Sequence, residues 1–264
     1  MPESTSGTAY DLAGIQGNPA VVLVHGLGMN RQMWRDYVPA LSRRYRVLTY
    51  DLHGHGDSRR APSNLSLSLF SKQLNDLLHE LQISRCVVIG FSLGGMINRR
   101  FAMDFPHCVS ALVILNSPHV RGPDEQQVIE KRIKTTAERG AKGTLEESIA
   151  RWFTPDFRSK MPAVISEVRV WVCNNDPVSY FQSREVLAKG ITELIRPQPP
   201  LALPTLVITC QNDSGSTPQM SHAIASEITN SRVEIIPELQ HLGLLEDPAA
   251  FLTPIEDFLA NSLN

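Results

Sequence analysis

A serine flanked by glycines joins a strand pattern to a helix pattern near the middle of the chain. The segment GFSLG at 90–94 follows the apolar run 86–89 and precedes a helical pattern that ends near Phe105. A serine in this strand–turn–helix position lies on a sharp turn, where side chains at the glycine positions would clash. The segment therefore predicts that Ser92 is a nucleophile at the end of a parallel strand. A bystander serine in a glycine-rich turn is the alternative interpretation.

Short apolar runs alternate with longer amphipathic stretches on both sides of this turn. In the stretch 66–81, five leucines and Phe70 fall on one helical face. Strands that read as continuous apolar runs, separated by helices, are typical of a parallel sheet covered on both faces. The sequence therefore predicts an α/β core. Its expected strands are 21–24, 46–50, 86–89, 109–115, 205–210 and 233–236.

Residues 119–199 interrupt this alternation. They contain helix signals and no convincing strand: Thr144 begins a TLEE segment that fits a capping box, and Asp176 before a proline fits a helix N-cap. A helical insertion between two core strands predicts a cap over the sheet, although an all-helix extension of the core would give the same pattern. The expected division is 1–118 and 200–264 for the core and 119–199 for the helical cap.

Composition excludes several classes of protein. The 264 residues carry 25 Lys and Arg against 27 Asp and Glu, so the formal charge is −2, which gives no electrostatic reason to bind nucleic acid. No apolar run reaches the roughly 18 residues that span a bilayer, and the N-terminal segment lacks the pattern of a secretory signal. We therefore expect a cytoplasmic protein with no nucleic-acid or membrane partner. Its four well-separated cysteines are expected to be free thiols: Cys86, Cys108, Cys173 and Cys210.

A serine nucleophile needs a histidine as base. In this strand–turn–helix arrangement the chain order is serine, then an acidic residue, then histidine. His222 lies within a helical pattern, whereas His241 lies in a loop after the last expected strand. Because catalytic groups collect in loops at strand ends, the sequence favours His241 as the base.

The acid that orients the histidine is expected on a loop as well. Asp213 follows the strand 205–210 and precedes a Thr-Pro pair, where a turn or N-cap role is the alternative. Asp247 follows His241 in the sequence and is expected to cap the last helix. Asn116, at the end of another strand, carries an amide and cannot serve as a carboxylate. The sequence therefore predicts Asp213 as the acid.

The negative charge that develops on a substrate carbonyl needs fixed N–H donors. One is expected from Leu93, the residue after the nucleophile and the first of a helix. The second is expected from the HGLG loop at 25–28, with Leu27 favoured over its two neighbouring glycines. His25 is interpreted as a structural loop residue rather than a base. Candidate substrate-contacting residues are His25, Trp152, Phe153 and Trp171, with packing inside the cap as the alternative for the three aromatic residues.

Other polar residues have simpler interpretations. His53 and His55 lack the third ligand that a zinc site requires, so a role in a turn is favoured and no metal or cofactor is expected. Four arginines could meet an anionic substrate, although solvated helix positions are the more common explanation for such residues: Arg31, Arg35, Arg99 and Arg100.

Across nearly its whole length the chain resembles the α/β-hydrolase fold family. The resemblance implies a mostly parallel, eight-stranded sheet flanked by helices, with a helical cap inserted after the sixth strand, and a Ser–Asp–His site. It rests on HGLG at 25–28, Trp34, DLHGHGDS at 51–58, GFSLGG at 90–95, Asp213 and His241.

The cap region, notably residues 149–158, is similar to that of 3-oxoadipate enol-lactonases. This similarity implies hydrolysis of a small ester or lactone substrate through an acyl-enzyme. Whether the substrate bears a carboxylate, and whether a cation in the pocket binds it, remain open. The chain departs from those enzymes in its His25-Gly26 pair and in one extra residue between Asp213 and the Thr-Pro pair. A C–C bond hydrolase of aromatic degradation and a triad-bearing ligand sensor with slow turnover remain open alternatives, as does a homodimer.

Overall fold

A single twisted sheet organises the chain. The computed structural model describes residues 2–263, and within them seven strands adopt the order β1-β3-β2-β4-β5-β6-β7. Only β1 runs antiparallel to its neighbour, β3; every other pair is parallel. The strands are β1 (Tyr10–Ala13), β2 (Ala20–Val24), β3 (Arg46–Tyr50), β4 (Cys86–Phe91), β5 (Val109–Leu115), β6 (Thr205–Cys210) and β7 (Ser231–Ile236).

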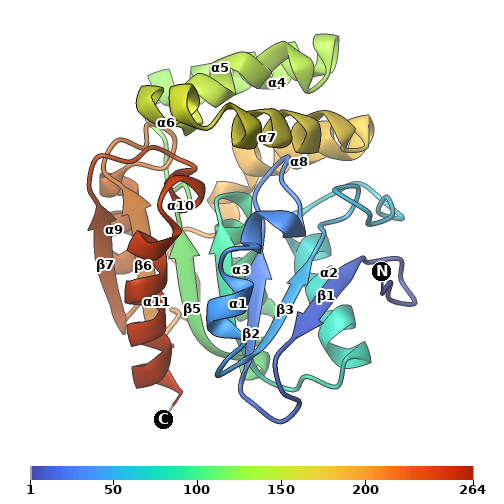
Figure 1. The fold of residues 1–264 in the computed structure, drawn as a ribbon, viewed down its shortest axis with the longest axis vertical. Helices are drawn as coiled ribbons and strands as arrows, with labels where there is room; N and C mark the ends of the chain where they lie inside the picture. Colours follow the sequence, from blue (N-terminus) through green and yellow to red (C-terminus); the bar gives the residue numbers. More distant parts are fainter. Residues whose placement is uncertain (1, 264) are drawn as a thin grey trace.

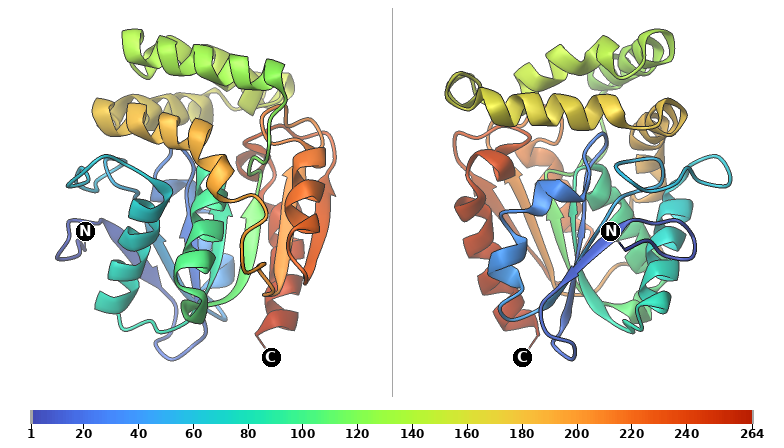
Figure 2. Two further views of the ribbon diagram at one scale, coloured as in Figure 1. Left: turned by 180° about the vertical axis from the view of Figure 1, so that it is seen from behind. Right: turned by 45° about the vertical axis from the view of Figure 1, so that its right-hand side comes forward.

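The central strands are buried on both faces. Every residue of β2, β4 and β6 is buried, as expected for runs of branched apolar residues in a covered parallel sheet. Helices α1 and α11 lie on the near face in Figure 1, and α2, α3 and α9 cover the opposite face, which Figure 2 shows from behind. The predicted α/β-hydrolase architecture is therefore confirmed.

The helices are long where the sequence has an amphipathic repeat and short where it turns. Ser66 begins α2 by accepting a hydrogen bond from the N–H of Leu69. The α-helices of the core are α1 (Val38–Leu41), α2 (Leu67–Glu80), α3 (Leu93–Asp104), α9 (Pro218–Ser226), α10 (Gly243–Glu246) and α11 (Pro248–Ser262). Three short 3-10 helices span Arg31–Trp34, Pro106–Cys108 and Gly190–Glu193.

The expected count of eight strands is wrong for the described residues, which form seven. The segment before β1 contains only an isolated bridge between Glu3 and Ala9. A tight turn causes this, because the N–H of Gly7 bonds the carbonyl of Ser4 and the φ of Gly7 is +82°. The chain reverses there within a few residues, too few for a strand to extend. The helical insertion accordingly follows the fifth described strand.

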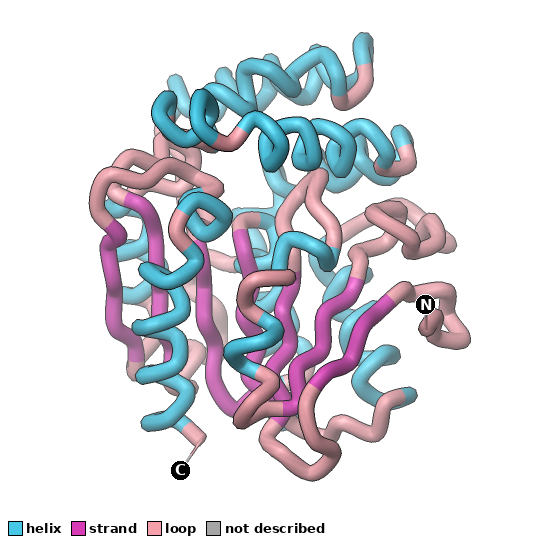
Figure 3. Tube along the Cα trace, viewed as in Figure 1, coloured by secondary structure: helices cyan, strands magenta, loops and turns pink. Residues whose placement is uncertain are grey.

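Five helices between β5 and β6 form a separate layer, which we call the helical layer (residues 123–189). Figures 1 and 3 show it across the edge of the sheet where the parallel strands end. Its members are α4 (Pro123–Arg139), α5 (Lys142–Trp152), α6 (Pro155–Lys160), α7 (Pro162–Asn174) and α8 (Pro177–Lys189).

The start of one of these helices differs from the sequence prediction. Asp176 caps α8 as expected, by accepting a hydrogen bond from the N–H of Ser179. The capping box predicted at Thr144 is wrong, because α5 begins two residues earlier, at Lys142. The Thr144 hydroxyl instead accepts a hydrogen bond from Arg184 of α8. A contact between α5 and α8 thus takes the place of the predicted hydrogen bond within α5.

Candidate active site

Ser92 occupies a strained turn between β4 and α3. Its φ is +55° and its ψ is −111°, a conformation that non-glycine residues rarely adopt. The turn is anchored to the sheet, since the N–H of Ser92 bonds the carbonyl of Leu115 on β5. A Cβ added at Gly90 would lie 2.1 Å from the carbonyl oxygen of Gly94. The glycines are thus required by close packing of backbone on backbone.

His241 lies in the loop after β7, and its ring contacts both Ser92 and Asp213. Its Nε2 is 3.2 Å from the Ser92 Oγ, and its Nδ1 is 2.6 Å from Oδ2 of Asp213. With Nδ1 carrying the proton, Nε2 is free to accept the hydroxyl proton of Ser92. The rival residues lie elsewhere: His222 is exposed on α9, and Asp247 caps α11 by accepting from the N–H of Ala250.

Asp213, which contacts the Nδ1 side of the His241 ring, is held as an ionised carboxylate. Its side chain is fully buried, and burial alone would raise its pKa. His241, the amide of Asn116 and the backbone N–H of Ser216 outweigh burial and hold the pKa of Asp213 below its ordinary value. Its other oxygen, Oδ1, accepts from the N–H groups of Gly215 and Ser216, at 2.8 and 3.0 Å.

Asn116 belongs to this network, although the sequence pattern marked it only as a residue that cannot serve as the acid. It follows β5 directly, has a φ of +45° and is fully buried. Its Nδ2 donates to Oδ2 of Asp213 at 2.9 Å. The signal that could have identified it is its position at the end of the strand next to β6, because neighbouring parallel strands end at the same edge.

The two expected N–H donors come from the segments that follow β2 and β4. Leu93 is the first residue of α3, and Leu27 follows the end of β2 and lines the cavity beside Ser92. Within residues 2–263, neither N–H donates a hydrogen bond. Both are therefore available to an oxygen atom of a ligand, and the N-terminal end of α3 adds a favourable dipole.

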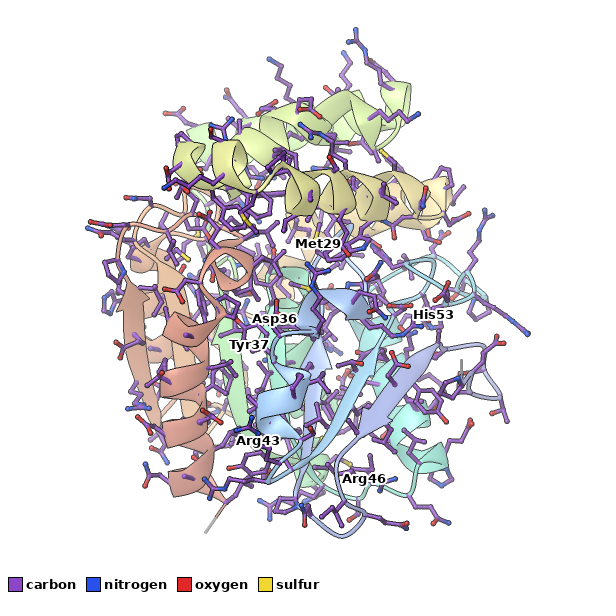
Figure 4. All side chains as sticks on the ribbon, in the orientation of Figure 1. Met29, Asp36, Tyr37, Arg43, Arg46 and His53 are labelled. Atoms are coloured by element: carbon purple, nitrogen blue, oxygen red, sulfur yellow. The ribbon has the colours of Figure 1, made fainter. Side chains whose placement is uncertain are left out.

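A cavity with an empty volume of about 630 Å³, including its open mouth, lies between the sheet edge and the helical layer. Ser92, His241, Leu27 and Trp152 of α5 are among the residues that line it. Met29 also lines it, and Figure 4 labels this residue at the boundary between the sheet and the helices.

Of the four candidate substrate-contacting residues, the structure brings only Trp152 to this cavity. His25 is fully buried outside it: Nε2 accepts from the N–H of Leu52, and Nδ1 bonds the carbonyl of Gly26. Burial lowers the pKa of His25 to about 4. Phe153 packs in the interior, stacked on Phe157, and Trp171 is buried on α7 without lining the cavity.

The arginines that line the cavity are not those expected from the sequence. Arg31 is buried and pairs with Asp51, and Arg99 donates to the carbonyl of Pro118. Arg35 pairs with Glu167 and Arg100 with Asp104. Four other arginines from the helical layer and the segment before it line the cavity instead: Arg121, Arg132, Arg151 and Arg184. Arg151 lies in the segment 149–158 that resembles the enol-lactonase cap, but no local pattern shows that the four arginines share a cavity, because they come from different segments and meet only on folding.

Other kinds of site are not found in the part of the chain that the structure describes. No group of three or more His, Cys, Asp or Glu side chains among residues 2–263 could hold a metal ion. His53 and His55 are both buried near the sheet edge. In the same range no helix is both long and apolar enough to cross a membrane. The four cysteines are free thiols.

The pattern that describes an alpha/beta hydrolase family matches residues 21–253, which include the serine turn, Asp213 and His241. The chain belongs to that family. This membership and the fold of its relatives make a hydrolase the class of protein supported by both sequence and structure.

Two relatives align along almost the whole chain. A 3-oxoadipate enol-lactonase of Acinetobacter baylyi is 27% identical, with 94% of each protein covered. An (E)-2-((N-methylformamido)methylene)succinate hydrolase of the same organism is 26% identical, with 93% of this chain and 91% of that protein covered. The crystal structure of an enol-lactonase from Burkholderia xenovorans superposes with a TM-score of 0.88, at 26% identity and 96% coverage of both chains.

Proposed function

We propose that this alpha/beta hydrolase cleaves a small carboxylic ester or lactone through an acyl-enzyme on Ser92. The observation that carries the proposal is the chain of contacts from Ser92 Oγ through the His241 ring to Asp213, with distances of 3.2 and 2.6 Å, beside an open cavity. The similarity to enol-lactonases in sequence and in structure supports the same class of substrate.

In the proposed reaction, His241 Nε2 takes the Ser92 hydroxyl proton as Oγ attacks the substrate carbonyl carbon. The N–H groups of Leu27 and Leu93 bind the resulting oxyanion. The bond to the leaving oxygen then breaks, and His241 delivers its proton to that oxygen. His241 then deprotonates a water molecule, whose oxygen attacks the carbonyl carbon of the acyl-enzyme. The bond from that carbon to Ser92 Oγ breaks, His241 returns the proton to Oγ, and the acid is released. Asp213 orients the imidazole and stabilises its charged form. No cofactor enters these steps.

The position of the helical layer supports a role as a cap. We propose that residues 119–199 form a cap that closes over the cavity, while residues 1–118 and 200–264 supply the catalytic groups. Trp152 of α5 lines the same cavity as Ser92, so it is the aromatic residue that we assign to the substrate. The four free cysteines and the small-molecule substrate favour a cytoplasmic enzyme.

Two measurements test the reaction. A fluorophosphonate probe is expected to label the wild-type protein at Ser92 and to leave Ser92→Ala unlabelled. Hydrolysis of 4-nitrophenyl acetate, 4-nitrophenyl butyrate, γ-butyrolactone and an enol-lactone is expected to fall about 10³-fold or more in that variant. A folded wild-type protein that neither reacts with the probe nor hydrolyses any of these substrates would contradict the proposal.

A further inference from the structure

The cavity beside Ser92 carries an unusual concentration of positive charge. Arg121 precedes α4, Arg132 lies on α4, Arg151 on α5 and Arg184 on α8, and all four line the same cavity. No Asp or Glu among the described residues lines it. Four guanidinium groups that line one cavity repel one another unless negative charge compensates them.

Two of the four arginines have protein partners that explain their positions. Arg132 forms an ion pair with Glu147 at 2.7 Å. Arg121 donates to the carbonyls of Leu187 and Ala188, in the last turn of α8, where carbonyl groups attract a cation. These two arginines therefore have structural roles that do not require a ligand.

The positive charge of Arg184 is only partly compensated by its neighbours. The residue is 6% exposed, and its Nη2 donates to the hydroxyls of Tyr180 and Thr144. These neutral oxygens fix the direction of the guanidinium without cancelling its charge. Its Nε is buried and has no hydrogen-bond partner within residues 2–263. The guanidinium also lies over the ring of Tyr180, with its Cζ 5.3 Å from the ring centroid, but no carboxylate within residues 2–263 forms an ion pair with it. A buried cation without a carboxylate partner is costly in a folded protein.

Arg151 has even fewer partners. Within residues 2–263 its side chain forms no ion pair and no hydrogen bond, and its Nε is shielded from solvent. Its guanidinium lies against the loop that carries Asp213, since a Cβ added at Gly215 would come within 2.7 Å of Arg151 Nη1. Burial and the neighbouring charge of Arg132 lower the pKa of Arg151 to about 10. Arg184 acts in the same direction, whereas the carboxylates of Asp213 and Glu147 oppose the shift. The group is therefore still charged at neutral pH.

We infer that Arg151 and Arg184 form a binding site for a free carboxylate of the substrate. This inference rests on the proposed function, because it assigns that carboxylate to a molecule whose ester or lactone carbonyl lies at Ser92. A carboxylate supplies the negative charge that neither guanidinium receives from an ion pair within residues 2–263, and it matches their planar geometry. The two arginines thereby select acidic esters or lactones over neutral ones.

The selection can be measured with two esters that differ by one charge. Monomethyl glutarate carries one ester and one carboxylate, whereas dimethyl glutarate carries two esters and no charge. The wild-type enzyme is expected to hydrolyse the monoester with at least a roughly tenfold higher kcat/KM. In Arg151→Gln, and separately in Arg184→Gln, the ratio of the two values is expected to fall about 10- to 100-fold.

Arg169→Gln is the matched control. Arg169 lies on α7 in the same helical layer, but it is partly exposed and pairs with Glu146. This variant is expected to keep the wild-type ratio. A wild-type enzyme that hydrolyses both esters equally well, or an Arg151→Gln variant that keeps the full preference, would overturn the inference while leaving the proposed function standing.

Binding to the Ser92→Ala variant tests the carboxylate site without turnover. Calorimetric titration of monomethyl glutarate is expected to show binding that weakens about 10- to 100-fold when Arg151→Gln is added, and dimethyl glutarate is expected to bind more weakly than the monoester. Equal binding of the two esters would overturn the inference. A wild type that is not labelled by the fluorophosphonate and hydrolyses no ester, but whose binding is selective for charge, would overturn the proposed function and leave the carboxylate site.

Discussion

Asn116 Nδ2 lies 2.9 Å from Oδ2 of Asp213, the same oxygen that His241 Nδ1 approaches to 2.6 Å. One carboxylate oxygen thus receives donors from two sides. Asn116 and Asp213 come from loops after neighbouring strands, β5 and β6. The amide fixes the direction of the carboxylate and, by donating to it, contributes to the lowered pKa of Asp213.

Replacing this amide should weaken the proposed triad of Ser92, His241 and Asp213 without removing any of its members. Asn116→Leu is expected to lower kcat for ester hydrolysis about 10- to 100-fold, because Asp213 loses a hydrogen bond to its charged form. The measurement is steady-state kinetics on 4-nitrophenyl butyrate, with circular dichroism to verify folding. A folded variant with the wild-type kcat would show that the remaining contacts orient Asp213 sufficiently.

The two aspartates that flank His241 in the sequence should behave differently. Asp213→Asn is expected to reduce kcat about 10⁴-fold, since the amide no longer holds the required tautomer of the histidine. Asp247→Ala, which removes the N-cap of α11, is expected to cost about 1 kcal/mol of unfolding free energy with little change in kcat. Urea melts and kinetics on both variants check this contrast. The reverse pattern would assign the acid to Asp247.

The close approach of backbone at Gly94 should make that position intolerant of a methyl group. A Cβ there would lie 2.3 Å from the carbonyl oxygen of Val24 and 2.7 Å from that of His25. Gly94→Ala is expected to lose about 1–3 kcal/mol of unfolding free energy and to lower kcat, because the strain displaces the loop that carries Leu27.

Gly122→Ala is the control for this substitution. An added Cβ at Gly122 would have its nearest neighbour at 3.9 Å, and the φ there is −67°. This variant is expected to lose less than about 1 kcal/mol. Equal stability of the two variants in urea unfolding would show that the turn can relax around the methyl group.

Two buried histidines should make the fold sensitive to mild acid. Burial lowers the pKa of His25 to about 4, and burial with the neighbouring charge of His25 lowers that of His55 to about 3. In the unfolded chain both would titrate near pH ~6.5. Between these values the unfolded state binds more protons, so the unfolding free energy should fall as the pH falls below about 6.5. The slope approaches about 1.4 kcal/mol per pH unit for each histidine.

Urea unfolding over a pH series from about 4.5 to about 7.5, on either side of the ordinary histidine pKa, measures this slope. His25→Gln is expected to flatten it, although the variant loses some stability at neutral pH. His222→Gln, at an exposed position on α9, is expected to leave the slope unchanged. A His25→Gln variant with the wild-type slope would place the pH dependence on other groups.

The carboxylate site should reduce the stability of the unliganded protein. Because the Nε of Arg151 is shielded from solvent and has no partner within residues 2–263, Arg151→Met is expected to raise the unfolding free energy by about 1 kcal/mol. Glutarate is expected to raise the melting temperature of the wild type but not that of the variant. A variant less stable than the wild type would indicate that Arg151 stabilises the fold itself.

The order of strands and helices, and with it the family, is encoded locally in the amino-acid sequence. Apolar runs and amphipathic repeats depend on local periodicity, so β2 to β7 and α2 could be located from the sequence alone. The strained turn at Ser92 was equally predictable, because Gly90 and Gly94 are required by contacts within a few residues or with the adjacent strand. The expected eighth strand was wrong for residues 2–263, since the turn at Gly7 reverses the chain too early.

Which side chains meet was settled by tertiary packing. Asn116 and Asp213 are 97 residues apart in the chain, and Arg151 and Arg184 come from different helices. No local pattern in the sequence encodes these contacts. Each of these residues would fit its own helix or loop equally well if the helices and strands packed differently. The sheet edge brings strand ends together, and the packing of α4, α5 and α8 brings the guanidiniums into one cavity. Helical periodicity predicted a helical insertion here, but the packing of its helices determined the charge around Ser92.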